Sequence, residues 1–308
     1  MKNDQENPNF RSGMATIIGR PNVGKSTLLN SILDTKVAIV SKVPQTTRNQ
    51  IRGILNHERG QIVFIDTPGI HFGGDNLDRY MNDCSQMTID DADCLIYLVD
   101  VSRRIGDDER TISKKLKDFK KPIILGLNKI DQGDRRIPEY IELWEESLGK
   151  PVNEMKKFTL LPLSGMNRTN VGKLIEIVFD NLPVGPAYYP SDIITDMPQR
   201  MAMADIIREK LFNLMKEELP HSIGVHIELM ERRKNNVTYM KVLIYVDREA
   251  HKEIVIGKKG LILKQVGMLA REELEALLKS KIFLDLHVKT QRNWRDDLSI
   301  LTELGYRF

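Results

Sequence analysis

A glycine-rich octapeptide near the N-terminus carries the strongest chemical signal in this sequence. Gly19 to Ser26 reads GRPNVGKS, which fits the pattern G-x-x-x-x-G-K-[ST] of a phosphate-binding loop, and it stands between an apolar run and a helix-like run. Glycines let backbone N–H groups converge on phosphate oxygens, and a helix N-terminus adds a positive dipole end. Lys25 can reach the β- and γ-phosphates, and Ser26 can hold Mg²⁺. An ordinary glycine-rich turn is the weaker alternative, because strand, loop and helix are in register.

A second motif, Asp66-Thr67-Pro68-Gly69, follows the apolar run Gln61–Ile65. The Asp66 carboxylate can hold a Mg²⁺-bound water, and the Gly69 N–H can sense a γ-phosphate. Pro-Gly also favours turns, so this tetrapeptide alone could be a turn. Its place after a strand and downstream of a phosphate-binding loop favours the nucleotide interpretation.

A third motif, Asn128-Lys129-Ile130-Asp131, follows the apolar run Pro122–Leu127. The Asp131 carboxylate only accepts hydrogen bonds, and it can take two, from N1–H and the 2-amino group of guanine. Adenine lacks that pair of donors, and an unpaired buried polar group costs about 1–3 kcal/mol. Asp131 therefore predicts discrimination of GTP from ATP, and Lys129 can lie along the base and ribose.

Two weaker signals complete the predicted nucleotide site. Ser164-Gly165 follows the last strand-like run and would place backbone N–H groups near guanine O6, although a simple turn fits almost as well. Thr46 and Thr47 lie between the first two motifs, where a threonine can complete the Mg²⁺ shell only when a γ-phosphate is present. We favour Thr47 over Thr46 as that ligand. Ordering of such a loop is the usual switch of GTP-binding proteins, and a threonine-rich edge strand is the alternative.

The surrounding elements predict where these motifs lie. Strand-like runs alternate with amphipathic helical stretches through the first part of the chain, which predicts a doubly wound parallel sheet with helices on both faces. Ligands in such sheets bind at the carboxyl ends of the strands, and each motif follows a strand. The expected strands are Met14–Ile18, Gln61–Ile65, Cys94–Asp100, Pro122–Leu127 and Phe158–Leu163, and the expected helices are Asp107–Phe119, Pro138–Leu148 and Val171–Asn181.

A proline-rich stretch divides the chain. We expect a GTP-binding domain over residues 1–182, a linker over 183–195 and a smaller α+β domain over 196–308. The smaller domain should contain a helix, two strands, two helices separated by a short loop, a third strand and a closing helix. The expected elements are Gln199–Glu218, Val225–Glu231, Val237–Asp247 and Ile282–Val288.

The loop of the smaller domain reads Gly257-Lys258-Lys259-Gly260, a G-x-x-G between two helical runs. Such a loop lets a sugar–phosphate backbone approach closely, and KH domains use it to clamp about four nucleotides of single-stranded RNA. Lys264 adds a further cation nearby. By itself the motif fits a basic helix–helix turn equally well, and the α-β-β-α-α-β order favours the RNA clamp. Trp294 could stack on RNA, but we favour a packed tryptophan.

Together these segments resemble the Era group of translation-factor-class GTPases. The resemblance is carried by GRPNVGKST, QTTRNQIRGI, DTPGI and NKID in the first part, and by the GKKG loop and NWRDD in the second, so it spans nearly the whole chain. It implies a P-loop GTPase domain followed by a type II KH domain. It implies GTP or GDP as ligand, Mg²⁺ held by Ser26 and Thr47, and catalytic roles for Lys25, Thr47 and Gly69. The implied nucleotide contacts are Asn22, Val23, Gly24, Lys25, Ser26, Thr27, Asp66, Gly69, Asn128, Lys129, Asp131, Ser164 and Gly165.

Four features bear on mechanism or local geometry when this sequence is set beside the family pattern. Ile70 stands where Ras-like enzymes use a glutamine to orient the attacking water, so hydrolysis must be organised otherwise. Asn22 stands where potassium-dependent members hold K⁺, which would stabilise charge in the transition state; a plain turn residue is the alternative. The group usually has Ser-Ala at Ser164-Gly165 and often GKGG at the RNA loop.

The resemblance also implies a biological role. It implies binding of the single-stranded 3′ end of 16S rRNA through Gly257, Lys258, Lys259, Gly260 and Lys264, and action in maturation of the 30S ribosomal subunit. A non-catalytic, GTP-regulated RNA-binding scaffold is the alternative. A cytoplasmic monomer, with peripheral association with the inner face of the cell membrane, is the expected state.

Composition agrees with this interpretation and excludes other classes. The chain has 308 residues and a net charge of +3, with 26 basic and 26 acidic side chains in residues 1–194 and 20 basic against 17 acidic in the remainder. The small basic excess therefore lies in the RNA-binding part. Two cysteines are too few for a disulfide framework, and no apolar run approaches the roughly 20 residues of a membrane-spanning helix.

Overall fold

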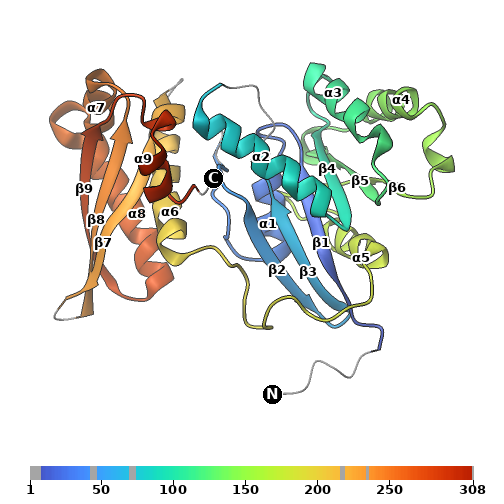
Figure 1. The fold of residues 1–308 in the computed structure, drawn as a ribbon, viewed down its shortest axis with the longest axis horizontal. Coiled ribbons are helices and arrows are strands. Elements are labelled where there is room, and N and C mark those ends of the chain that lie inside the picture. The colour runs from blue at the N-terminus through green and yellow to red at the C-terminus, as the bar shows by residue number, and fades with distance from the viewer. Residues whose placement is uncertain (1–7, 42–46, 69–73, 216–218, 234–235, 307–308) are drawn as a thin grey trace. The chain divides into compact units, whose positions relative to one another are not determined.

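The chain folds into two compact units. The computed structural model describes residues 8–41, 47–68, 74–215, 219–233 and 236–306 (Figure 1). Unit 1 contains Met1–Ala38, Thr47–His71 and Met81–Asp196, and unit 2 contains Ile39–Thr46, Phe72–Tyr80 and Met197–Phe308. Two short segments of the N-terminal half are thus grouped with the C-terminal part, which the sequence did not indicate. Within the described residues, no helix is long and apolar enough to cross a membrane.

Unit 1 is built on a six-stranded sheet in the order β2-β3-β1-β4-β5-β6. Its strands are β1 (Arg11–Ile18), β2 (Ile51–His57), β3 (Gly60–Asp66), β4 (Cys94–Asp100), β5 (Ile123–Asn128) and β6 (Phe158–Pro162). The predicted strands are confirmed within a few residues. The predicted parallel sheet also has an antiparallel strand at one edge, because β2, which was not predicted, runs antiparallel to β3. Its sequence, IRGILNH, is short and partly polar, as suits an edge strand exposed along one side.

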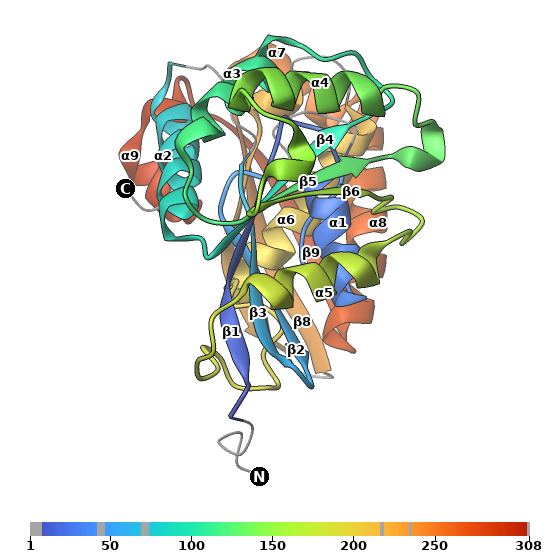
Figure 2. The same ribbon diagram turned by 90° about the vertical axis from the view of Figure 1, so that its right-hand side faces the viewer.

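Helices cover both faces of this sheet, as Figure 2 shows. They are α1 (Lys25–Leu33), α2 (Asn76–Asp91), α3 (Asp107–Lys115), α4 (Ile137–Leu148) and α5 (Val171–Asn181). Helices α1 and α5 pack against one face around Ile17, Phe64 and Ile96. Helices α3 and α4 pack against the other face around Tyr97 and Leu125. Because successive residues of a strand face opposite sides, the interior strands are apolar throughout.

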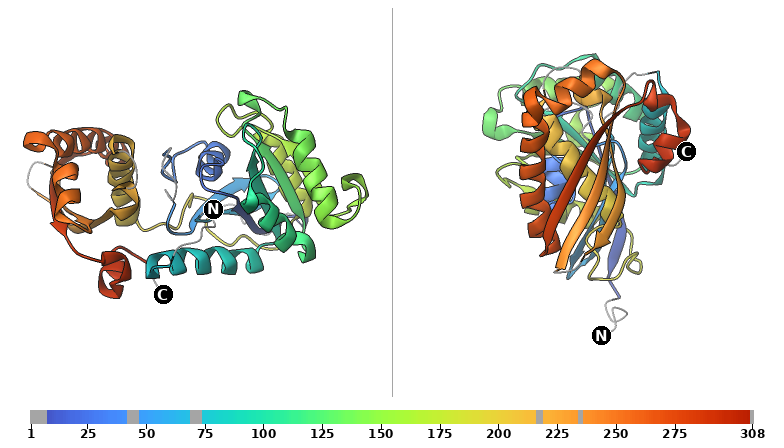
Figure 3. Two further views of the ribbon diagram at one scale, coloured as in Figure 1. Left: turned by 90° about the horizontal axis from the view of Figure 1, so that it is seen from above. Right: turned by 90° about the vertical axis from the view of Figure 1, so that its left-hand side faces the viewer.

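Unit 2 is a three-stranded sheet with helices packed against it (Figure 3). Its elements are α6 (Gln199–Leu214), β7 (Gly224–Arg232), β8 (Val237–Val246), α7 (Glu249–Ile256), α8 (Leu261–Leu278), β9 (Lys281–Thr290) and α9 (Leu298–Glu303). Strand β8 pairs antiparallel with β7 and parallel with β9. The core joins α6, α7 and α8 to the sheet through residues such as Ile207, Val242 and Val266. This is the predicted α-β-β-α-α-β order, and the predicted two-part fold class is confirmed.

The predicted linker packs along unit 1. The backbone N–H of Ser12 donates to the Pro183 carbonyl at 3.1 Å, and that of Ile54 donates to the Ile194 carbonyl at 2.8 Å. Gln61 holds the middle of the segment, because its Oε1 accepts the N–H groups of Tyr188 and Tyr189 at 2.8 and 2.9 Å. The segment therefore has a defined path along the sheet of unit 1.

Trp294 is packed inside unit 2, as we favoured from the sequence. Its side chain is fully buried, and its indole N–H donates to the Ser222 carbonyl at 2.9 Å. A Cβ added to Gly224 would lie 3.3 Å from the ring, so the fit is tight. The alternative of a tryptophan available for stacking on RNA is wrong.

We expect Trp294→Phe to lower the free energy of unfolding by about 2 kcal/mol, because it leaves a cavity and a carbonyl without its donor. Urea unfolding followed by circular dichroism measures the change. RNA affinity of the folded variant should equal that of the wild type. Unchanged stability with weakened RNA binding would contradict the packing role.

Candidate functional site

The predicted nucleotide residues gather at the carboxyl edge of the sheet of unit 1. The phosphate-binding loop follows β1, Asp66 ends β3, Asn128 ends β5 and Ser164 lies just past β6. Parallel strands bring these ends to a common edge, which is where ligands of open α/β sheets bind. The fold thus assembles four segments that are far apart in sequence.

Glycine is required at two positions of the phosphate-binding loop. Gly19 and Gly24 have φ of +154° and +102°. A Cβ on Gly19 would lie 2.3 Å from the Leu98 carbonyl oxygen, and one on Gly24 would lie 2.5 Å from Nδ2 of Asn128. Any side chain at either position would therefore displace the loop.

The loop is held by hydrogen bonds to its carbonyl groups. Nζ of Lys25 lies 3.0 Å from the carbonyl oxygens of both Gly19 and Arg20. Nζ of Lys129 donates to the carbonyl of Asn22 at 2.8 Å, and Nδ2 of Asn128 donates to that of Val23 at 2.7 Å. The carbonyls are thereby occupied by protein donors. The first N–H groups of α1 have no partner within the helix, and these are the donors that an anion would meet.

Ser26, Thr47 and Asp66 form a cluster of oxygen atoms beside the loop. The Ser26 hydroxyl donates to Oδ2 of Asp66 at 2.6 Å and lies 2.9 Å from the Thr47 hydroxyl, which is 3.3 Å from the same Oδ2. Oδ1 of Asp66 is buried and has no hydrogen-bond partner in the described part of the chain. A buried carboxylate oxygen without a donor beside two hydroxyls fits a hard cation such as Mg²⁺.

Burial sets the charge balance of this cluster. Burial raises the pKa of Asp66, while Lys25 and the two hydroxyls oppose that shift. Burial likewise lowers the pKa of Lys25, against the attraction of Asp66. Each group therefore depends on the charge of the other. A bound phosphate and its cation would supply further partners for both, so the site is suited to that pair of ligands.

The residues predicted to bind the base are linked to the phosphate-binding loop through Asn128. Its Nδ2 holds Val23, and its Oδ1 accepts the N–H of Gly165 at 3.0 Å. Asp131 is exposed two residues beyond Lys129, and Ser164 is fully buried, with its hydroxyl accepting the N–H of Asn167. A Cβ on Gly165 would lie 3.2 Å from Cα of Leu28, so Gly165 packs closely against α1.

The remaining predicted residues lie as follows. Asn22 is in the loop with a left-handed φ of +64°, and Thr27 is half-buried in the first turn of α1. Gly69, proposed as a γ-phosphate sensor, lies outside the described residues, as do Thr46 and Ile70. The structure therefore brings Thr47 to the cluster and describes nothing of the alternative ligand.

The G-x-x-G loop of unit 2 has the backbone that its glycines predict. Gly257 and Gly260 have φ of +73° and +74°, and Lys259 between them has φ of +52°. A Cβ on Gly257 would lie 2.6 Å from Cγ1 of Ile262, so this position excludes a side chain. Lys258, Lys259 and Lys264 are exposed around it. The loop ends α7 and begins α8, and it presents cations next to bare backbone.

Comparison with known proteins identifies the family. The chain is 42% identical over 97% of its length to GTPase Era of Halothermothrix orenii, and 44% identical over 96% of its length to GTPase Era of Alkaliphilus metalliredigens, covering 99% of each. The chain belongs to the Era family of GTPases. Residues 14–129 match a family described as 50S ribosome-binding GTPase, and residues 218–295 match the KH domain family.

Solved Era structures share the whole fold. A crystal structure of Era in complex with MgGDPNP and nucleotides 1506–1542 of 16S ribosomal RNA superposes with a TM-score of 0.90 at 35% identity, over 97% of this chain and 100% of the other. A point variant of Aquifex aeolicus Era bound to GDP and aluminium fluoride superposes with a TM-score of 0.89 at 35% identity, with the same coverage. The KH assignment of the second part is thereby confirmed.

The sequence analysis missed the residue that anchors Lys129 in this Era-family chain. Oδ2 of Asp100 accepts Nζ of Lys129 at 2.7 Å, and Oδ1 accepts the N–H and hydroxyl of Ser102. Burial opposes ionisation of Asp100, but the bonds from Lys129 and Ser102 outweigh it and hold the pKa below its usual range. A carboxylate that ends an apolar strand at the carboxyl edge of a sheet was the signal available.

A second missed contact holds the phosphate-binding loop from outside. The Arg20 guanidinium lies 2.9 Å from Oε2 of Glu109, whose side chain is almost fully buried, and 3.0 Å from Asp108. Glu109 also accepts the N–H of Gly106 at the start of α3. The Arg20–Glu109 ion pair thereby connects the loop to α3, and no short sequence motif predicts it.

We expect Asp100→Asn to weaken GTP affinity about tenfold while leaving the turnover of bound GTP close to wild type, because the charge that positions Lys129 is lost. Single-turnover phosphate release against GTP concentration separates the two quantities. Because the pKa of Asp100 is lowered, its pairing is complete above its usual pKa and is lost only as the pH falls through the lowered value. Wild-type affinity should therefore not vary around neutral pH on account of this group.

The matched control is Asp134→Asn, which removes an equal charge from an exposed residue of the neighbouring loop. Its GTP affinity should match wild type. Equal losses in both variants would show that only net charge matters and would contradict the positioning role of Asp100.

Proposed function

We propose that this protein binds and hydrolyses GTP with Mg²⁺ and uses the cycle to switch its binding to the single-stranded 3′ end of 16S rRNA during maturation of the 30S ribosomal subunit. The observation that carries the proposal is the Ser26–Thr47–Asp66 cluster beside the phosphate-binding loop, in a chain that also has a G-x-x-G loop. Family membership supports GTP as the nucleotide. The relative crystallised with 16S rRNA nucleotides supports the RNA.

Different residues would bind the phosphates, the guanine base and Mg²⁺. Loop N–H groups and Lys25 would bind the phosphates, and Asp131 would accept the donors of the guanine edge. Ser26 and Thr47 would hold Mg²⁺, with Asp66 beside them; when bound, the ion neutralises charge on the β- and γ-phosphate oxygens. The Thr47 hydroxyl would complete the Mg²⁺ shell only when a γ-phosphate is present, so this contact would distinguish the GTP state from the GDP state.

Hydrolysis must proceed without a glutamine at position 70. Ile70 cannot hydrogen-bond the attacking water, and Gly69 could supply only its N–H. We infer that Asn22 holds K⁺ beside the phosphates, where a fixed cation stabilises the charge of the transition state. The alternative, a scaffold that binds GTP without hydrolysing it, predicts no phosphate release in either K⁺ or Na⁺, with or without RNA.

We infer the cellular location from the family resemblance alone. The expected location is the cytoplasm, with peripheral association with the inner face of the membrane, and the expected state is a monomer. The partner would be the 30S subunit, which the protein would contact through its rRNA.

Gly69 and Lys25 would complete the catalytic set together with Thr47.

We expect wild-type GTP hydrolysis to be faster in K⁺ than in Na⁺, and Asn22→Gly to hydrolyse GTP at the same slow rate in both. Glycine is the right substitution because Asn22 has a left-handed φ, which glycine adopts without strain. Phosphate release in matched K⁺ and Na⁺ buffers gives the ratio. A variant that kept the full K⁺ stimulation would rule out Asn22 as the ligand.

We expect Gly257→Asp to abolish binding to the 3′ end of 16S rRNA, since a side chain there would clash with Ile262 and add a negative charge beside phosphate. Fluorescence anisotropy with labelled RNA and a scrambled RNA, each with a GTP analogue and with GDP, measures affinity, selectivity and nucleotide dependence. GTP hydrolysis by the variant reports that unit 1 remains folded. Equal weak binding of both RNAs, unaffected by the substitution, would contradict the RNA clamp.

A further inference from the structure

A lysine-rich cavity of about 560 Å³ lies at the amino edge of the sheet of unit 1. It opens where β5 and β6 begin, whereas the nucleotide residues lie where those strands end. It is lined by Leu116, Lys117, Asp118, Phe119, Lys120, Lys121, Ile123, Leu148, Lys150, Glu154, Met155, Lys156, Lys157 and Phe158. We call it the lysine cavity, and it is separate from the nucleotide site.

The six lysines of this cavity outnumber its two acidic residues. Five are exposed and Lys121 is half-buried. In the described part of the chain, none of the six makes an ion pair with a carboxylate. Two amines bind backbone carbonyls, Lys121 that of Asp90 and Lys157 that of Lys120. The amines of the other four lysines make no hydrogen bond or ion pair with the described residues.

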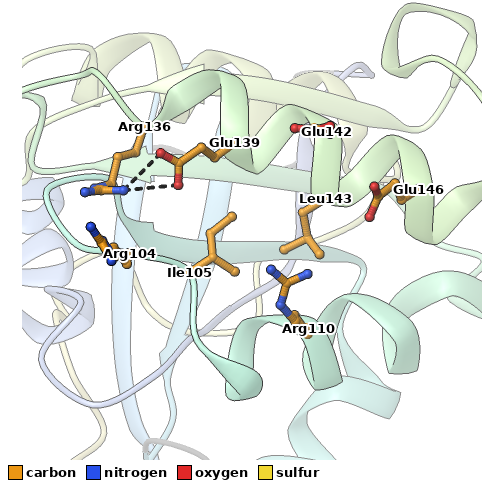
Figure 4. Close-up of a pocket in the computed structure, with 8 residues that line it drawn as sticks. All are labelled: Arg104, Ile105, Arg110, Arg136, Glu139, Glu142, Leu143 and Glu146. Atoms are coloured by element: carbon orange, nitrogen blue, oxygen red, sulfur yellow. Dashed lines mark hydrogen bonds and ion pairs between the residues drawn. The ribbon is translucent and has the colours of Figure 1, made fainter.

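This concentration of charge is local. Residues 1–194 hold equal numbers of basic and acidic side chains, so the N-terminal part of the chain is not basic as a whole. The cavity drawn in Figure 4 shows the contrast, because its three arginines face three glutamates and Arg136 lies 2.9 Å from Glu139. The cavity of Figure 4 therefore has no net charge that would attract an anion. The lysine cavity has a net positive charge and attracts anions.

Hydrogen bonds hold the frame of the lysine cavity together. The N–H of Ile123 donates to the Lys157 carbonyl at 2.9 Å, and the Lys157 amine returns to the Lys120 carbonyl at 3.1 Å. These bonds join the segment before β5 to the segment before β6. Met155 and Leu116 are buried beneath them. The backbone that carries the lysines is therefore fixed, and the entropy lost on binding is mainly that of the lysine side chains.

We propose that the lysine cavity binds the phosphate backbone of ribosomal RNA outside the single strand held by the G-x-x-G loop. The proposal rests on the proposed RNA-binding function. A G-x-x-G loop clamps only about four nucleotides, whereas the RNA crystallised with a relative runs from nucleotide 1506 to 1542. RNA held at one site is presented to a second site on the same molecule at high effective concentration. Lysines on flexible stems suit phosphates irrespective of base sequence.

RNA fits this surface better than an anionic membrane does. Membrane-surface binding by a basic patch is strengthened by apolar side chains that project into the lipid. The apolar residues of the lysine cavity are buried or half-buried instead, and none of them is among the large exposed hydrophobic side chains of the described residues. The apolar residues are buried and the lysines are exposed, so an RNA phosphate backbone could lie across the opening of the cavity and contact the lysines.

The test combines Lys117→Gln, Lys120→Gln and Lys156→Gln in the full chain, three exposed lysines whose amines make no hydrogen bond or ion pair with the described residues. The probes are a short RNA of the 16S rRNA 3′ end and intact 16S rRNA, titrated at several salt concentrations. We expect unchanged binding of the short RNA. For 16S rRNA we expect affinity to fall about tenfold or more, and the slope of log K against log salt to fall by about two to three.

The matched control combines Arg104→Gln, Arg110→Gln and Lys173→Gln, which removes equal charge from exposed positions outside the lysine cavity. It should keep the wild-type slope. Equal losses in both variants, or none in either, overturn the proposal. So does a lysine variant that retains 16S rRNA binding but loses binding to vesicles containing phosphatidylserine. Failure of the wild type to bind the short RNA would instead refute the proposed RNA clamp.

A second measurement needs no variant. Acetylation of lysines in the wild-type protein, with and without 16S rRNA, is quantified by mass spectrometry. Lysines of the cavity should be protected by 16S rRNA but not by the short RNA, while Lys173 stays equally reactive. Equal reactivity of the cavity lysines in both conditions contradicts the proposal even if the variants fold poorly.

Discussion

The nucleotide site depends on where the carbonyl groups of one short loop point. A phosphate can be bound by backbone N–H groups only if the neighbouring carbonyls are turned away and satisfied elsewhere. Here the carbonyls of Gly19, Arg20, Asn22 and Val23 are all taken by side-chain amines and amides. Two of the three donors come from the end of β5, so the loop has its shape only when β1 and β5 are in the same folded sheet.

The same requirement explains what a sequence can and cannot reveal about this chain. Gly24, Lys25, Asn128 and Asp131 stand in short contiguous motifs whose spacing is set by one loop or one strand end, and the structure brings their segments together. Asp100 and Glu109 act on those motifs from other elements, and no spacing along the chain relates them to Lys129 or Arg20. Contacts of that kind are decided by tertiary packing.

The strands can be divided in the same way, into those that the sequence predicts and those that it does not. Interior strands such as β4 and β5 are apolar on both faces and end at polar residues, so their first and last residues could be predicted from the sequence. Strand β2 was not predicted, because an edge strand needs fewer apolar residues and this one mixes polar side chains with glycine. Helix α2 was not predicted either, because it mixes polar residues with few apolar ones. In unit 2, by contrast, the order of the elements and the two glycines were sufficient to predict the loop.

Asn128 has a consequence for how such a site can change over evolution or by engineering. One amide side chain bonds to Val23 on the phosphate side and to Gly165 on the base side. The segment predicted to select the base and the loop predicted to bind the phosphates are therefore held by the same side chain. A base-selecting loop transplanted from another nucleotide-binding protein would have to bring an equivalent amide with it. Otherwise the graft would lose its hold on triphosphate before its choice of base could matter.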